Sequence, residues 1–129
     1  MVTGGNATVF ISSMDQAVRF YTETIGLRLA ERYDDHWATV QAGNGFTIGL
    51  HPASPKYPPP GTKGATTIGL EVDDPVEGLM KTLGEKGVRM RGIEEGAGAK
   101  FLHIEDPDGN EIYLWETHAR AEQDAASAA

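Results

Sequence analysis

The sequence predicts an α+β domain in which a β-α-β-β-β module occurs twice in tandem. Two observations lead to this prediction: the chain is similar to itself at a nearly constant separation, and each copy shows the same order of strand-like and helix-like patterns. A chain of 129 residues has the length of one ordinary domain. We therefore expect residues 1–129 to form a single domain that contains both copies.

The internal repeat appears in two blocks. In the first, residues 8–29 align with residues 69–90 at a separation of 61 positions. In the second, residues 37–51 align with residues 101–115 at a separation of 64 positions. The difference of three residues falls near the stretch "EEGAGA". A duplication of this kind determines the architecture more firmly than local propensity does.

The first module is expected over residues 6–51 and opens with an alternating strand at 7–12. Ser13 followed by Gln16 is a capping-box pattern, which predicts the start of a helix. Gly26 suits the position just after a helix, where a left-handed backbone is common. Three strands should follow, near 27–34, 36–42 and 46–51.

The second module is expected over residues 65–116 and repeats this order. A strand at 66–72 precedes a helix whose start is marked by Asp74, Pro75 and Glu77. Gly87 takes the place that Gly26 has in the first module. Three further strands are predicted near 88–94, 100–105 and 111–116.

Two segments outside the modules have a different composition. Residues 52–64, "PASPKYPPPGTKG", are rich in proline, which cannot join a central ladder and which favours an extended backbone. We interpret this segment as a linker between the modules. The end of the chain, residues 117–129, offers little apolar surface to bury, so a flexible tail is expected there.

Composition excludes several classes of function. The 11 Lys and Arg residues against 19 Asp and Glu residues give a net charge of −8, which disfavours binding to nucleic acid or to an anionic membrane. No apolar run approaches the roughly 20 residues that span a bilayer, and the first residues lack the pattern of a signal peptide. A cytoplasmic protein is therefore expected. The absence of cysteine excludes disulfides, thiolate nucleophiles and zinc–thiolate sites.

Two motifs give the sequence a family resemblance. The helix segment "AVRFYTETIGLRL" and the hairpin "EDPDGNEIYLWE", within duplicated β-α-β-β-β modules, resemble the vicinal oxygen chelate superfamily of glyoxalase I, bleomycin-resistance proteins, fosfomycin-modifying enzymes and extradiol dioxygenases. The likeness covers residues 6–116. It implies that the modules form a cupped mixed sheet around a cavity for a small organic molecule. It also implies a homodimer, and some members build each cavity from two chains.

The resemblance further implies four positions at which metal-dependent members carry His or Glu. In this sequence those positions are occupied by Asn6, Gly49, Thr67 and Tyr113. Glycine has no side chain, the Asn and Thr groups are poor neutral ligands, and a phenol with an ordinary pKa near 10 needs strong activation before it binds a metal. We therefore expect no metal ion and no other cofactor.

Strand alternation predicts which side chains line the cavity. Leu102, Ile104, Ile112 and Leu114 form one apolar set, which is assigned to the helix-packed face. The opposite face and its repeat equivalents supply the predicted ligand-binding residues: Phe10, Trp37, Gln41, His51, Glu71, Phe101, His103, Tyr113 and Trp115. Such an aromatic wall with few polar groups is typical of small-molecule pockets. Gly49 and Gly69 would leave room for a ligand, although the same rings could instead fill a closed core.

Three of these residues are also catalytic candidates. His103, His51 and Tyr113 could act in acid–base chemistry, because histidine titrates near neutrality. A displaced metal site made of His51, Glu71 and His103 is chemically possible. It is poorly supported by the spacing, since Glu71 lies four residues, about 13 Å along a strand, beyond the family position at Thr67. Arginines on the second strand of each module, including Arg91, are expected at the surface, where one could reach an anionic ligand.

The leading hypothesis is a metal-independent binding protein of the glyoxalase and bleomycin-resistance type, which sequesters a drug or metabolite in its aromatic cavity. An enzyme of the same superfamily is the alternative, either an isomerase, lyase or cyclase that uses His and Tyr or one that uses the displaced metal site. A protein-interaction domain with a collapsed cavity is a third class. The ligand itself cannot be identified from the sequence.

Overall fold

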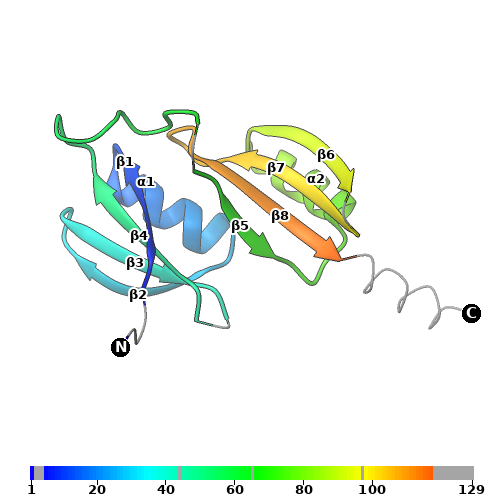
Figure 1. Cartoon of the computed structure of the whole chain (residues 1–129), viewed down its shortest axis with the longest axis horizontal. Coiled ribbons are helices and arrows are strands. Elements are labelled where there is room, and N and C mark those ends of the chain that lie inside the picture. Colours follow the sequence, from blue (N-terminus) through cyan, green and yellow to red (C-terminus); the bar gives the residue numbers. More distant parts are fainter. Residues whose placement is uncertain (2–4, 44, 65, 97, 118–129) are drawn as a thin grey trace, which may run out of the picture. The chain divides into compact units, whose positions relative to one another are not determined.

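Figure 1 shows the computed structural model of the chain, which describes residues 1, 5–43, 45–64, 66–96 and 98–117. Apart from Thr117, the predicted tail lies outside these residues. The chain divides into two compact units. The first unit comprises Met1–Gly64 together with Asp106–Asn110, and the second comprises Ala65–Glu105 together with Glu111–Ala129.

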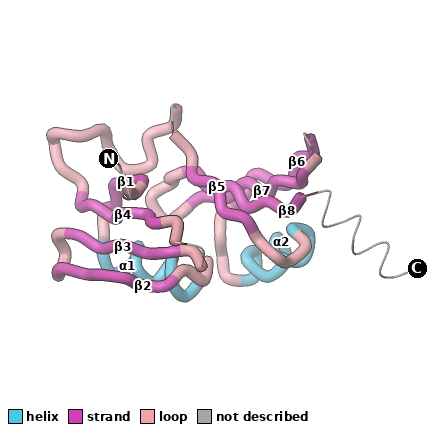
Figure 2. The backbone as a smooth tube through the Cα atoms, turned by 60° about the horizontal axis from the view of Figure 1, so that its bottom comes forward, coloured by secondary structure: helices cyan, strands magenta, loops and turns pink. Residues whose placement is uncertain are grey.

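The first unit contains a four-stranded mixed sheet in the order β1-β4-β3-β2. The β1 strand is parallel to β4, and the other neighbours are antiparallel. In Figure 2 the first helix lies along one face of this sheet. The elements are β1 (Ala7–Ile11), α1 (Met14–Arg19), the π-helix η1 (Phe20–Thr24), β2 (Arg28–Tyr33), β3 (Trp37–Gln41) and β4 (Thr47–Pro52).

The second unit repeats this topology with the sheet order β5-β8-β7-β6. Again the first strand is parallel to the last and the remaining pairs are antiparallel. The elements are β5 (Ile68–Glu71), α2 (Val76–Glu85), β6 (Met90–Gly96), β7 (Ala99–Glu105) and β8 (Glu111–Thr117). The predicted α+β class and the duplicated β-α-β-β-β order are confirmed, although β5 is shorter than the strand predicted at 66–72.

Each sheet buries one face against its helix, as the alternation of apolar residues requires. In the second unit, α2 packs against β6, β7 and β8. The apolar set predicted for this face, Leu102, Ile104, Ile112 and Leu114, is buried. In the first unit the buried apolar side chains are Val9, Ile11, Met14, Ala17, Val18, Phe20, Tyr21, Leu27, Ala38, Val40, Ile48 and Leu50.

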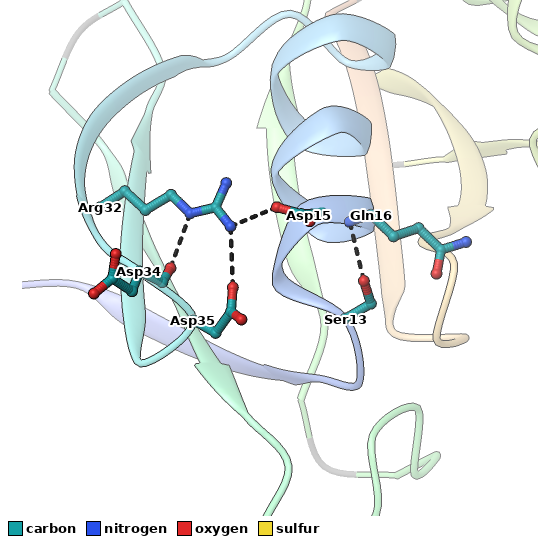
Figure 3. Close-up of polar contacts among 6 residues, drawn as sticks. All are labelled: Ser13, Asp15, Gln16, Arg32, Asp34 and Asp35. Carbon is teal, nitrogen blue, oxygen red and sulfur yellow. Dashed lines mark hydrogen bonds and ion pairs between the residues drawn. The ribbon is translucent and has the colours of Figure 1, made fainter.

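The two main helices begin in different ways. The Ser13 hydroxyl accepts a hydrogen bond from the Gln16 N–H at 3.2 Å, so the predicted N-cap is present (Figure 3). At α2, Pro75 is the N-cap residue and its side chain has no capping hydrogen bond. The Val76 N–H donates instead to the buried Glu116 carboxylate of β8 at 3.2 Å. This second cap comes from a residue 40 positions away, so local sequence could not reveal it.

Arg32 joins the start of α1 to the turn between β2 and β3 (Figure 3). Its guanidinium lies 2.6 Å from the Asp15 carboxylate and 3.2 Å from the Asp35 carboxylate, and it also donates to the Asp34 carbonyl at 2.9 Å. The hydrogen bond from Arg32 holds the pKa of Asp15 below its ordinary value. Because these carboxylates are exposed, the pairs fix geometry more than they add stability.

Both helical segments end at the predicted glycines. Gly26 and Gly87 have φ angles of 93° and 80°, in the left-handed region that glycine tolerates. Before Gly26 the helix widens into the π-helix, in which the Ile25 N–H donates to the Phe20 carbonyl at 3.0 Å. The sequence pattern did not predict this wider turn, which is rare in proteins.

The turn between β7 and β8 belongs to the first unit, and its hydrogen bonds explain why. Asp106 is buried, and its carboxylate accepts hydrogen bonds from the Tyr21 hydroxyl at 2.8 Å and from the Asn110 N–H at 2.8 Å. It also accepts from the Asp108 N–H at 2.9 Å and from the Asn110 side-chain amide at 2.8 Å. Burial, followed by the nearby Asp106 carboxylate, raises the pKa of Tyr21 well above its ordinary value.

Two further side chains attach this turn to β1. The Asp108 carboxylate accepts from the Ser12 hydroxyl at 2.5 Å and from the Ser12 N–H at 3.1 Å. The Asn110 amide donates to the Phe10 carbonyl at 3.0 Å. The "DPDGN" segment of the predicted hairpin is therefore more than a connection between two strands, because its side chains bind residues that lie far away in the chain.

Within the ranges described above, no helix combines the length and the apolar character needed to span a membrane.

Candidate functional site

A pocket of about 320 Å³ lies on the outer face of the second sheet. The strands β6, β7 and β8 and the residue before β5 supply its walls. Its polar and aromatic lining consists of Thr67, Arg91, Glu94, Phe101, His103, Glu111 and Tyr113. These side chains alternate with the buried apolar set along β7 and β8, so the face opposite α2 carries the pocket.

Tyr113 stands at the centre of the aromatic wall. Its ring meets the edge of Phe101 with centroids 5.7 Å apart and an interplanar angle of 72°. The His103 ring lies 6.3 Å from Tyr113, opposite it in the β7–β8 ladder. Trp115 lies 6.0 Å from Tyr113 on the other side. These spacings are those of favourable aromatic pairs, so the wall is a connected group of rings.

Two charged pairs lie beside the rings. The Arg91 guanidinium is 3.0 Å from a Glu111 carboxylate oxygen, and His103 Nε2 is 3.5 Å from Glu94 Oε1. The Thr67 hydroxyl donates to the Glu111 carbonyl at 3.1 Å. The pocket therefore combines an apolar ring surface with two carboxylates, one guanidinium and one imidazole.

A β-bulge explains how Arg91 reaches the pocket. In the ladder Met90 pairs with Ile104 and Gly92 pairs with His103, so Arg91 is the extra residue between two consecutive pairs. Gly92 has a φ of 111°, which glycine tolerates and which suits a bulge. Ile93 pairs with the buried Leu102 and so belongs to the face against the helix. Simple alternation would place Arg91, two residues earlier, on that same face. The bulge returns it to the outer face.

A family model described as "Glyoxalase/Bleomycin resistance protein/Dioxygenase superfamily" matches residues 5–114. The chain belongs to the glyoxalase/bleomycin resistance protein/dioxygenase superfamily. The resemblance of the two motifs is thus confirmed. No curated protein matches the chain in sequence.

Solved structures of the same superfamily are similar over nearly the whole chain. TnmS3, an antibiotic binding protein from Streptomyces sp. CB03234, has 27% identity and a TM-score of 0.70, covering 91% of this chain and 98% of its own. A glyoxalase/bleomycin resistance protein from the same organism has 29% identity and a TM-score of 0.66, covering 87% and 100%. Lactoylglutathione lyase from Agrobacterium tumefaciens, at 16% identity and a TM-score of 0.70 over 91% and 95%, shows the fold alone.

The positions at which the resemblance implies metal ligands do not fit a metal ion in this superfamily member. The Asn6 side-chain oxygen accepts a hydrogen bond from the Thr8 hydroxyl at 3.0 Å, and the Thr67 hydroxyl donates one to the Glu111 carbonyl. Gly49 has no donor atom, and Tyr113 presents a phenol. Among the residues that the structure describes, no three His, Cys, Asp or Glu side chains are grouped so that they could hold a metal.

The space expected at two glycines is filled by rings, which corrects the sequence-based interpretation. A Cβ atom at Gly49 would collide with the ring of Trp37, and one at Gly69 would collide with the ring of Tyr113. These glycines therefore allow an aromatic side chain of a neighbouring strand to lie flat on the sheet. The pocket lies beside the Tyr113 ring, not in a hollow above Gly69.

The first unit holds an aromatic cluster on the equivalent face of its own sheet. Phe10 stacks on Tyr57, with centroids 4.4 Å apart and an angle of 23°. His51 meets Phe10 at 5.5 Å, Tyr57 at 5.6 Å and Trp37 at 6.3 Å. His51 Nδ1 lies 2.8 Å from the Pro52 carbonyl, so Nδ1 donates this hydrogen bond.

The remaining predicted residues lie elsewhere. The Gln41 side chain accepts from Arg28 and donates to the Thr47 hydroxyl at 3.2 Å. Glu71 is exposed at the end of β5, where Trp115 is its ladder partner. Glu71 and His103 are two strands and two residues apart, so their Cα atoms are separated by about 12 Å. This separation disfavours a shared metal ion.

Three of the predicted ligand-binding residues thus line one pocket, namely Phe101, His103 and Tyr113. Sequence reasoning missed Glu94 and Tyr57. Glu94 is the direct ladder partner of Phe101, which the register of β6 reveals and the sequence does not. Tyr57 is the one aromatic residue in the proline-rich segment, and this was the available signal for a role in packing.

Proposed function

We propose that the chain is a metal-independent binding protein for a small organic molecule, held in the pocket of the second unit. The observation that carries this proposal is the pocket of about 320 Å³ with its wall of Phe101, Tyr113 and His103. Small-molecule sites are concave and mostly apolar, with a few polar groups that fix orientation, and they start at about 300 Å³. The pocket reaches this volume, and its rings and charged groups can supply both the apolar surface and the orienting contacts.

Independence from a metal is supported by the chemistry of the four family positions. Three carry neutral side chains and the fourth is glycine, whereas hard or borderline divalent ions prefer carboxylate and imidazole ligands. The proposed binding therefore depends on ring contacts, hydrogen bonds and charge. No other cofactor is included in this proposal.

The ligand class is suggested by a structural neighbour. TnmS3 is described as an antibiotic binding protein, and it is 27% identical over almost its full length. We propose by analogy that this chain sequesters an aromatic antibiotic or metabolite, which would confer resistance by lowering the free concentration of the compound.

A thermal-shift screen tests this proposal. The full chain, with and without chelator treatment, is heated in the presence of aromatic antibiotics and metabolites. A ligand that binds only the folded state raises the melting temperature, and the stabilisation grows with the logarithm of the ligand concentration above Kd. We expect hits that persist after chelation and that Phe101→Ala abolishes, whereas Phe46→Ala, an equal truncation in the turn between β3 and β4, leaves them unchanged.

Mass analysis of each hit separates binding from catalysis. An unchanged compound supports sequestration, and a converted compound supports an enzyme. Elemental analysis of untreated protein adds an independent check: a stoichiometric transition metal that is lost in His51→Ala or His103→Ala contradicts the metal-independent proposal.

An enzyme that uses acid–base chemistry is the second candidate, and one observation favours it. His103 lies on the pocket wall with its Nε2 3.5 Å from Glu94 Oε1, an arrangement in which a carboxylate can orient an imidazole. His103, with Tyr113 beside it, would then serve an isomerase, lyase or cyclase reaction. In that case His103→Gln would abolish conversion while the ligand still binds.

The homodimer, the cytoplasmic location and the domain boundaries expected from the sequence stay predictions. The homodimer implied by the resemblance is checked by sedimentation equilibrium of the full chain. The cytoplasmic location is checked by fractionation of cells that express it. The domain boundaries, including the linker at 52–64, are checked by limited proteolysis, which should cut the linker before either module.

A further inference from the structure

We propose that this pocket selects aromatic ligands that carry a positively charged amine, with the aromatic body against Phe101 and Tyr113 and the amine beside Glu94. This inference rests on the proposed function, because it names the ligand class of the same pocket.

The charges of the lining do not balance. The guanidinium of Arg91 is already paired with Glu111 at 3.0 Å. Among the described residues, the partner of the Glu94 carboxylate is the His103 ring at 3.5 Å, and no Lys or Arg pairs with this carboxylate. The permanently charged groups of the lining are thus one guanidinium and two carboxylates, and the carboxylate that has no guanidinium partner is Glu94.

The register places the unbalanced carboxylate next to the rings. Glu94 and Phe101 are direct partners in the antiparallel β6–β7 ladder, and directly opposite residues have Cβ atoms about 5 Å apart. Phe101 in turn contacts Tyr113. An amine beside Glu94 thus brings the aromatic body to which it is attached over the Phe101 and Tyr113 rings.

The rings themselves favour a cation. The face of a Phe or Tyr ring carries partial negative charge and attracts an ammonium group within about 6 Å of its centroid. The net charge of −8 on the chain adds a long-range field that attracts cations and repels anions. An anionic ligand would have to separate Arg91 from Glu111 before it could use the guanidinium, so this class is disfavoured.

A matched probe series tests the inference. The probes are 2-naphthylmethylamine, 2-naphthylmethanol and 2-naphthoic acid, which share one aromatic body and differ in charge. Binding to the full chain is measured by isothermal titration at low and high salt. We expect the amine to bind about 5- to 30-fold tighter than the alcohol, from one exposed ion pair and one cation–π contact, with the acid weakest.

Two neighbouring glutamates supply the variant and its control. Glu94→Gln should reduce the preference for the amine over the alcohol to about threefold or less, because only the ring contact is left. Glu95→Gln removes the same charge from the next residue, whose ladder partner is Lys100, and should leave the preference unchanged. The side chain of Glu94 is 72% exposed, so its replacement does not endanger the fold.

The outcomes distinguish the inference from the proposed function. If the alcohol binds as tightly as the amine and Phe101→Ala weakens both, the ligand pocket stands and the charge preference is wrong. Tighter binding of the acid also overturns the inference. If no probe shows binding that depends on Phe101, both the inference and the proposed binding function are contradicted.

Discussion

The two hairpin turns at equivalent positions of the repeat have the same backbone hydrogen bond and different side chains. In the first turn the Ala42 N–H donates to the Phe46 carbonyl at 2.9 Å, and in the second the Asp106 N–H donates to the Asn110 carbonyl at 3.0 Å. Ala42 and Phe46 have no polar side-chain atoms, whereas Asp106 and Asn110 attach the second turn to Tyr21 of η1 and to Phe10 of β1. The duplicated pattern therefore specifies the backbone of the turn, and the side chains decide whether the turn forms hydrogen bonds to other elements.

The outer faces of the two sheets differ in the same way. Both sheets have a bulge in the second strand of their module, with Ala30 at the extra position in the first and Arg91 in the second. Both lay an aromatic ring over a glycine. In the first unit Tyr57 then stacks on the cluster, while in the second unit a charged pair borders an open pocket. A repeated fold thus carries two different surfaces.

The largest loss of stability is expected when Asp106 of the second turn is replaced by alanine, the residue that the first turn has at the equivalent position, Ala42. Asp106→Ala removes a buried carboxylate that accepts from Tyr21, Asp108 and Asn110, so several donors lose their partner. Each buried unsatisfied group costs about 1–3 kcal/mol, so we expect a loss of about 3–5 kcal/mol in the free energy of unfolding. Urea denaturation measures this loss. A cost below about 1 kcal/mol would show that the side chains of this turn are dispensable.

The partner of Asp106 gives the next effect and a pH dependence. Tyr21→Phe removes one hydrogen bond to this carboxylate, which should cost about 1.5–3 kcal/mol near neutral pH. The pKa of Tyr21 is raised on folding, so above its ordinary value near 10.0 the unfolded state binds fewer protons than the folded one. Stability should therefore fall as the pH rises above 10, and the variant should show a shallower fall.

Denaturation midpoints across the alkaline range measure this slope for both proteins. Tyr33→Phe serves as the control, because the pKa of Tyr33 is also raised, by its hydrogen bond to Glu31, but Tyr33 is 60% exposed. An equal alkaline slope in wild type and Tyr21→Phe would mean that Tyr21 does not contribute to it.

The glycines under the rings test how firmly each outer face is packed. Gly49→Ala should cost about 1–3 kcal/mol, because the new Cβ collides with the Trp37 ring. Gly69→Ala should cost less, since Gly69 is less buried and the Tyr113 ring can move toward the pocket that it borders. Urea denaturation of both variants gives the comparison.

A double-mutant cycle identifies the cause of this cost. In a Trp37→Ala background the penalty of Gly49→Ala should largely disappear, because the colliding ring is gone. Gly78→Ala in α2 should instead raise the free energy of unfolding by about 0.5–1 kcal/mol, because a Cβ atom added there meets no neighbour within 4 Å. An undiminished penalty in the Trp37→Ala background would contradict the packing explanation.

The smallest expected effect concerns the ring that covers the first unit. Tyr57→Ala removes the ring stacked on Phe10 and should reduce the free energy of unfolding by about 1–2 kcal/mol. Tyr33→Ala, which truncates an exposed ring of the same sheet, should change it by less than about 0.5 kcal/mol. Similar values for the two variants would mean that the proline-rich segment does not contribute to the packing of this face.

Much of the fold could be predicted because its signals are local. Alternation sorted Leu102 and Leu114 into the core, Ser13 marked the start of a helix, and Gly26 and Gly87 marked the ends. The internal repeat then fixed the order of elements and supported the family resemblance. The strand and helix signals depend on residues a few positions apart, and the repeat depends only on comparing the chain with itself, so one sequence is enough to read them.

The site was predicted only in part, because its geometry depends on register. Phe101, His103 and Tyr113 were found by alternation along one hairpin. Arg91 was expected only at the surface, as one of several arginines that could reach an anionic ligand, because the bulge that brings it to the pocket does not follow from alternation. A bulge of one residue inverts every assignment beyond it, and the local signal for this bulge is the glycine that follows, Gly92.

The sequence by itself determined the duplicated architecture, the buried face of each sheet and the identity of the side chains at the family's metal positions. The tertiary structure decided which rings fill the space over Gly49 and Gly69, which glutamate lies beside Phe101, and where Asp106 finds its donors. The physical reason is distance along the chain. Tyr21 and Asp106 are 85 residues apart, and only folding brings such groups within hydrogen-bonding reach.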